Sequence, residues 1–142
     1  MTTRSTGARG SATLELAVLL PAVLILLALV TAAARLTVAA GAVEQAAAAG
    51  ARQASLVRSA GTAQGLAVAA VRANLAGQGV RCSPLEVAVA AAALQRRVGE
   101  SGQVAVTVSC SVPLADLGVP GLPGSRRIER VALSPVERYR GR

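Results

Sequence analysis

The feature that most constrains this chain is a charge-free apolar run near its N-terminus, residues 16–34, which lies between Glu15 and Arg35. As an α-helix rising about 1.5 Å per residue, this run spans roughly 28 Å, close to the hydrocarbon thickness of a bilayer. A helix buried in a soluble protein rarely stays apolar on every face over such a length. We therefore expect residues 11–35 to form a single membrane-spanning helix.

The residues before the run predict its orientation. Residues 1–10 contain Arg4 and Arg9 and no acid, and positively charged flanks stay on the cytoplasmic side. We expect residues 1–10 to be a cytoplasmic leader and residues 36–142 to be an extracytoplasmic domain on a bacterial cell membrane. The run itself has three possible fates: an uncut anchor, a secretory signal cut after the small residues "TAAA", or a helix retained after cleavage before it.

Glu15 favours cleavage before the helix. A carboxylate at the edge of the hydrocarbon costs a few kcal/mol unless it is paired or reaches the interface, and neither a plain anchor nor a secretory signal gains anything from it. If the chain is cut between Gly10 and Ser11, the new α-amino group is positively charged and Glu15 becomes the fifth mature residue. In a helical bundle, that carboxylate can meet the amino terminus of a neighbouring subunit and set the axial register.

The stretch "RGSATLELAVLLP" resembles the processing region of type IV pilin-like proteins, with a basic leader, a terminal Gly, a small residue and then Glu. Together with "AAAAGARQA" downstream, it more narrowly resembles the TadE-like family, the minor pseudopilins of the tight-adherence (Flp) pilus machinery. The resemblance covers about the first fifty residues. The chain departs from the family at Leu16, where an aromatic is frequent, and at Ala49, where an acid is frequent.

The resemblance implies that Gly10 and Ser11 flank the bond cut by a prepilin peptidase, and that Glu15 is the assembly residue. It implies a non-enzymatic minor pilin or pseudopilin that takes part in pilus assembly or adhesion. The expected partners are the prepilin peptidase, other pilins and pseudopilins, pilus-assembly membrane proteins and the lipid bilayer. Two alternatives remain open: a secreted or single-pass anchored binding domain unrelated to pili, and a type II secretion pseudopilin.

Composition argues against other classes of function. The chain has no His, and its acids, Asp116 and the Glu residues, are spread singly. Metal sites need clustered ligands and acid–base catalysis needs paired titrating groups, so we expect no catalytic residues, no metal and no cofactor. The net charge of +8 comes from scattered Arg residues without interleaved aromatics, so we expect no nucleic-acid partner either.

Beyond Arg35 the helical periodicity continues, and we expect a helix over residues 36–60. A narrow stripe of small residues recurs at steps of three and four, which predicts a packing face; its members are Val43, Ala47, Gly50, Ala54 and Val57. Glu44 and Arg52 fall off this stripe. A second, shorter helix is expected over residues 62–76, ended by Gly77 or Gly79.

The last part of the chain changes to the alternation typical of strands. We expect strands near residues 85–90, 104–112 and 128–133, with Val104, Val106 and Val108 on the inner face of the clearest one. The segment between the first two is expected to be a hairpin loop or a helical turn. Residues 112–127, rich in Pro and Gly, are expected to be an irregular surface excursion. The predicted class is α+β, a small antiparallel sheet on a long helix, as in pilin-like folds.

The two cysteines, Cys82 and Cys110, lie on either side of the predicted hairpin. Unpaired buried thiols are one possibility, since Cys is a frequent core residue. Export to an oxidising compartment favours a disulfide instead. Such a bond contributes on the order of 3 kcal/mol in the chain-entropy model, which suits a core with only 1% aromatic residues.

Overall fold

The computed structural model describes residues 9–95, 101–117 and 123–136. They form two α-helices, two short 3-10 helices and three strands, in the order α1 (Arg9–Ser55), α2 (Ala60–Gly77), β1 (Leu85–Ala90), η1 (Ala92–Gln95), β2 (Gly102–Pro113), η2 (Leu114–Leu117) and β3 (Ser125–Val136). The predicted α+β class, with a long N-terminal helix on a small antiparallel sheet, is confirmed.

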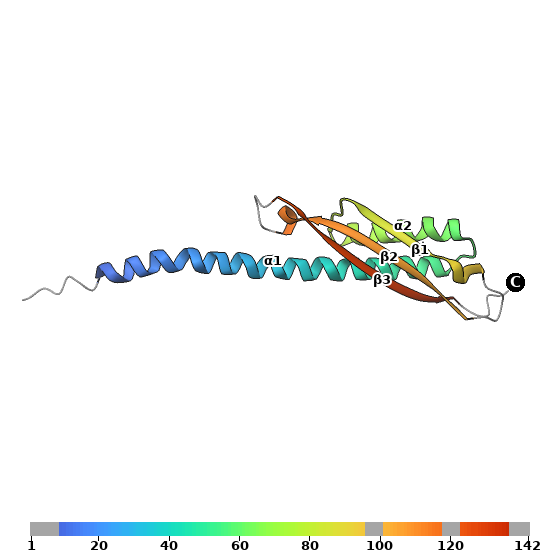
Figure 1. Cartoon of the computed structure of the whole chain (residues 1–142), viewed down its shortest axis with the longest axis horizontal. Helices are drawn as coiled ribbons and strands as arrows, with labels where there is room; N and C mark the ends of the chain where they lie inside the picture. Colours follow the sequence, from blue (N-terminus) through green and yellow to red (C-terminus); the bar gives the residue numbers. More distant parts are fainter. Residues whose placement is uncertain (1–8, 96–100, 118–122, 137–142) are drawn as a thin grey trace, which may run out of the picture.

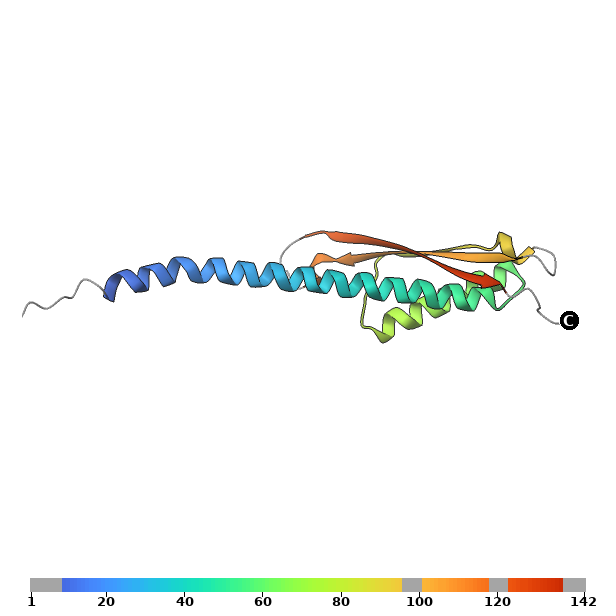
Figure 2. The same ribbon diagram turned by 90° about the horizontal axis from the view of Figure 1, so that it is seen from below.

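The sheet and α2 surround only the second half of α1 (Figures 1 and 2). The three strands are antiparallel in the order β1-β2-β3, and the sheet lies on one side of the helix pair. α1 packs mainly against β2, β3 and α2, while α2 also reaches β1. The first half of α1 projects away from this domain (Figure 1), and its residues 15–31 are all exposed.

The predicted small-residue stripe of α1 is its packing face inside the chain. Val43, Ala47 and Ala54 have no exposed side-chain surface, and Val57 is partly buried against the same core. The inner face of β2 closes this core, because Val104, Val106 and Val108 are also fully buried. The core is thus built almost entirely from small aliphatic side chains that allow close approach of backbones.

Gly50 lies where three elements come close together. A Cβ atom at this position would lie 2.9 Å from Val71 Cγ2 on α2, and 3.4 Å from both the Ala67 carbonyl oxygen and Val106 Cγ1 on β2. A side chain at this position would therefore force Val71, and the part of α2 that carries it, to shift.

The end of α2 is fixed by a glycine in the left-handed region. Gly79 has φ +69°, and its N–H donates to the Ala76 carbonyl at 3.1 Å, while the Val80 N–H donates to the Leu75 carbonyl at 3.0 Å. These two bonds satisfy carbonyls that the helix end would otherwise leave free. The helix ends at Gly77, one of the two predicted glycines, and Gly79 forms the turn beyond it.

The prediction of an irregular excursion over residues 112–127 is wrong at both ends. β2 continues through Pro113 and β3 begins at Ser125, and these two residues face each other at the end of the ladder. A proline is tolerated there because a terminal position can forgo one N–H donor. Between the strands, the chain forms η2, and residues 118–122 lie outside the described part. Residues 91–102 contain the short helical turn η1, the second of the two expected forms.

A disulfide and two hydrogen bonds link the helical part of the domain to the sheet. The predicted disulfide joins Cys82, in the α2–β1 connection, to Cys110 on β2, with the Cα atoms 5.1 Å apart. Buried Ser134 on β3 donates to Ser55 at the end of α1 (3.1 Å), and the Gln64 amide on α2 donates to the Val87 carbonyl of β1 (2.8 Å). Each links a helix or its connection to a different strand.

Candidate functional site: the projecting half of α1 and the groove beside α2

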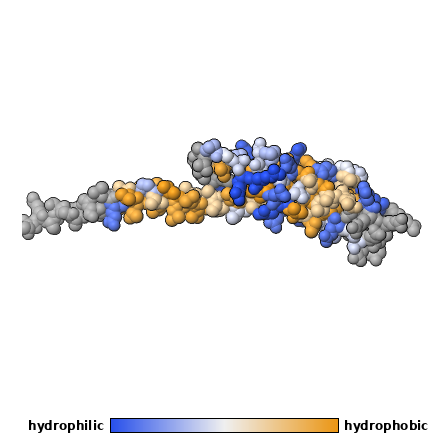
Figure 3. Space-filling model, viewed as in Figure 1, coloured by the Kyte–Doolittle hydropathy of each residue, from blue (hydrophilic) through white to orange (hydrophobic). Residues whose placement is uncertain are grey.

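The projecting half of α1 exposes large aliphatic side chains on every face. From Leu16 to Val30 the large hydrophobic residues are between 52% and 74% exposed, and Figure 3 shows them as a continuous apolar surface that begins just beyond the domain. This segment is long and apolar enough to cross a membrane, and none of its most apolar stretch is buried within the chain. A core helix of a soluble protein would instead bury such residues. The N-terminal helix thus has the character of a single membrane anchor.

Glu15 lies at the outer end of this apolar surface, on α1, and its side chain is exposed. Among the described residues, no hydrogen-bond or ion-pair partner contacts its carboxylate. Gly10 and Ser11 lie in the first turn of α1. Ser11 precedes Glu15 by four positions, about 6 Å along a helix axis, so the two residues lie about one turn apart on α1.

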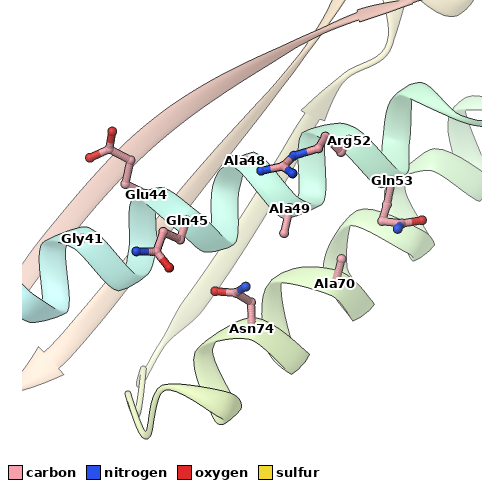
Figure 4. A pocket seen from close by; sticks show the side chains of 9 residues that line it. All are labelled: Gly41, Glu44, Gln45, Ala48, Ala49, Arg52, Gln53, Ala70 and Asn74. Atoms are coloured by element: carbon pink, nitrogen blue, oxygen red, sulfur yellow. The ribbon is translucent and has the colours of Figure 1, made fainter.

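A groove of about 830 Å³ runs between α1 and α2 over the domain half of α1. Figure 4 shows Ala49 on α1 and Ala70 on α2 pointing into the space between the helices, where they form the floor of the groove, with Gln45, Gln53 and Asn74 beside them and Glu44 at the outer edge, pointing away from α2. The polar residues that line it are Glu44, Gln45, Arg52, Gln53 and Asn74. The groove therefore has small side chains between the helices and polar side chains along its edges.

The polar side chains that line the groove make few hydrogen bonds to the described residues. At one end of the groove the Gln78 amide, at the terminus of α2, donates to Asn74 at 2.6 Å and to Gln45 at 3.4 Å. The side chains of Glu44 and Arg52 make no hydrogen bond or ion pair with the described residues. They are eight positions apart, about 12 Å along α1, so the rim offers one charge of each sign to an approaching partner.

The groove was not predicted from the sequence, in which Glu44 and Arg52 stood out only as residues off the packing stripe. Nothing in the sequence singled out Gln45, Gln53 and Asn74. The groove that they line exists only because α1 packs against α2, and this packing could not be predicted from the sequence. The recurrence of polar residues at positions 44, 45, 52 and 53, two helical turns apart, was the available hint.

A polar cluster on the outer face of the sheet joins all three strands. Arg127 on β3 forms an ion pair with Glu86 on β1 at 2.9 Å and donates to Ser109 on β2 at 3.1 Å, while Ser109 donates to Glu129 at 3.0 Å. Both ion-pair side chains are more than 60% exposed, so the pair contributes little to stability. The cluster acts as a surface staple across the sheet and offers no catalytic arrangement.

The N-terminal part of the chain matches a known family. Residues 10–52 match the family model described as TadE-like protein, which confirms the resemblance predicted from the sequence over that segment. The matched range starts at Gly10 and ends with Arg52, so it includes Glu15, the projecting half of α1 and most of the helix that faces the groove. No curated protein and no solved structure matches the chain.

Proposed function

We propose that this protein is a minor pilin or pseudopilin of a tight-adherence pilus, held in the bacterial cell membrane by the projecting half of α1. The proposal depends chiefly on one observation: the segment that matches the TadE-like family is a single helix, of which one half is exposed and apolar and the other half organises a folded domain. A pilin-like subunit needs this architecture, because it is first held in a membrane and then packs beside other helices in an assembly.

In this proposal, a prepilin peptidase cuts between Gly10 and Ser11 on the cytoplasmic side and leaves the whole apolar segment on the mature chain. The new α-amino group and Glu15 then carry opposite charges at the start of the helix. Within the hydrocarbon an unpaired carboxylate is costly, so a neighbouring subunit that brings its own amino terminus to Glu15 lowers the free energy of one particular axial register. Glu15 is thus an assembly residue, and the protein performs no catalysis.

The groove between α1 and α2 would receive a helix of another pilin-like subunit. Three observations support this occupant: the groove lies along the same helix as the exposed apolar surface, its alanine floor permits close helix approach, and its rim presents Glu44 and Arg52 for charge pairing. A neighbouring helix that contacts the projecting half of α1 in the membrane would continue along this groove outside it. One partner would therefore be recognised over the full length of α1.

Replacement of Glu15 tests the proposal most selectively. Glu15→Ala should leave membrane insertion intact, measured as resistance to alkaline carbonate extraction, because it removes a charge from the apolar segment. It should reduce co-purification with the other pilins and lower the amount of pili on the cell. Glu129→Ala is the matched control, since it removes an exposed carboxylate from the outer face of the sheet, away from α1.

Unchanged pilus output from the Glu15→Ala strain would contradict the proposed role. It would favour instead an anchored binding domain with no part in any filament. A type II secretion pseudopilin predicts the same sensitivity at Glu15 but a loss of protein secretion in place of a loss of pili, so both outputs are measured in the same strains.

A further inference from the structure

A second hollow, of about 560 Å³, lies at the end of the domain from which the projecting half of α1 emerges. Four parts of the chain meet there: α1, the connection from α2 to β1, the end of β2, and η2. The residues that give the hollow its chemistry are Arg35, Val38, Val80, Arg81, Val112 and Asp116. It is separate from the groove beside α2, with which it shares no lining residue.

The rim of this hollow is cationic. Arg35 comes from α1 and Arg81 from the turn after α2, and both side chains are exposed. Arg126, also exposed, lies opposite Val112 in the β2–β3 ladder, so a third guanidinium belongs to the same end of the sheet. Asp116 is the one acid among the lining residues, and its backbone orients Arg35, since Nη1 of Arg35 donates to the Asp116 carbonyl oxygen at 3.4 Å.

The inner surface of the hollow is apolar. Val38, one turn beyond Arg35 on α1, is 69% exposed, and Val80 and Val112 also line the hollow. An apolar surface rimmed by arginines suits the boundary between acyl chains and headgroups, where the stems of long basic side chains cover apolar surface while their guanidinium groups reach phosphate.

The position along α1 matches that boundary. Arg35 is the first charged residue after the apolar run, so a bilayer that contains residues 16–34 places its headgroups at the level of the hollow. Planar guanidinium groups can each donate two hydrogen bonds to one phosphate. Because two or three such groups come from separate elements, they would hold the whole domain in one orientation on the membrane. A single arginine at the end of the membrane-spanning segment would not do so.

We propose that this hollow binds the phosphate of anionic phospholipid headgroups in the bilayer that holds α1, and that Arg35 and Arg81 are the principal contacts. This inference depends on the membrane anchoring in the proposed function but not on pilus assembly. It assigns to the base of the domain a role distinct from that of the groove: the base sets the orientation of the domain on the lipid, and the groove receives another subunit.

The test uses the full chain in nanodiscs made either of phosphatidylcholine alone or of phosphatidylcholine with phosphatidylglycerol. Amide hydrogen exchange at residues 79–81 and 114–117 should be slower in the anionic discs, and the difference should shrink in 0.5 M salt because exposed charges are screened (Debye length a few Å near 1 M). Removal of either arginine should raise the exchange rate in the anionic discs roughly fivefold, because one basic residue near an anionic surface contributes about 1 kcal/mol to binding.

Arg35→Gln combined with Arg81→Gln should abolish the lipid-dependent protection, whereas Arg52→Gln, which removes the same charge from the groove, should preserve it. Equal protection in the two lipid mixtures, in a chain that co-elutes with the discs, would overturn the headgroup site and leave membrane anchoring intact. A chain that co-elutes with neither kind of disc would overturn both the site and the membrane anchor.

Discussion

The two halves of α1 belong to one continuous helix, yet they face different surroundings. The projecting half carries Leu, Ile and Val, and a central residue such as Leu24 is 58% exposed. The packed half is dominated by Ala and Gly, and Ala46, for example, is fully buried. The packed half also carries polar residues, such as Glu44 and Arg52, whereas residues 16–34 of the projecting half carry no charge.

Side-chain size explains the difference. Small residues let α2 and the sheet approach the backbone of α1 closely, as at Gly50, whereas rows of Leu and Ile present bulky flexible surface that suits lipid chains. The packed half of α1 allows close packing but buries little area per residue, since each alanine removes little apolar surface from water. The domain therefore depends on close contact and on a covalent link to compensate.

The largest contrast is expected from a charge in the projecting half. Leu24→Arg places a guanidinium near the centre of the apolar segment, at a cost of about 3 kcal/mol for membrane insertion. The fraction of chain in the membrane pellet should fall strongly, whereas Leu24→Ile should leave it unchanged. Full membrane retention of the Leu24→Arg chain would mean that this half of α1 does not cross the bilayer.

Loss of the disulfide should affect only the packed half and its domain. The double change Cys82→Ala with Cys110→Ala is expected to lower the free energy of unfolding on the order of 3 kcal/mol, because the link closes a loop of 28 residues in the unfolded chain. Thermal unfolding of the full chain in detergent micelles measures the loss, with membrane retention as the parallel readout. Treatment of the wild-type chain with a reductant should reproduce the shift, and a shift confined to the variant would point to packing at Cys110 instead.

The two glycines of the packed half should respond with opposite signs. Gly50→Ala introduces a methyl group 2.9 Å from Val71 Cγ2 and should lower stability by about 1–2 kcal/mol. Gly41→Ala meets nothing within 4 Å, so the better helix propensity of alanine should raise stability by up to about 1 kcal/mol. The same thermal unfolding experiment compares them, and equal responses would contradict the idea that close approach at Gly50 organises the domain.

The smallest effect is expected on the outer face of the packed half. Glu44→Gln changes an exposed residue with no ion pair to the described residues and should alter stability by less than about 0.5 kcal/mol. Its effect should appear in co-purification with other pilins, because the groove rim loses its negative charge. A large loss of stability would show that Glu44 supports the fold and not a partner.

Much of the fold followed from local patterns. The alternation of Val104, Val106 and Val108 predicted the central strand and its inner face, and the stripe through Val43 and Gly50 predicted how α1 packs. The ends of the outer strand were predicted poorly. β3 is an edge strand of the sheet, and its Arg126 and Arg130 remain exposed although they lie on the same side of the strand as buried Ile128. This breaks the alternation on which the prediction relied.

Features of the candidate site could be predicted only where all of their residues lie in one segment of the sequence. Glu15, Gly10 and the apolar run are neighbours along the chain, so the local spacing of residues was enough to relate them. The groove and the cationic hollow each depend on which elements lie side by side. Arg35 and Arg81 are far apart along the chain, and only the packing of α2 against α1 brings them to one rim.

The most direct test of the central claim is the intact mass of the protein isolated from the membranes of its native cells. We expect a chain that begins at Ser11, has lost residues 1–10 and retains the entire projecting half of α1. A chain that still carries its first ten residues, or one that has been cut near Ala34 and lacks the apolar segment, would contradict the proposed processing and assembly.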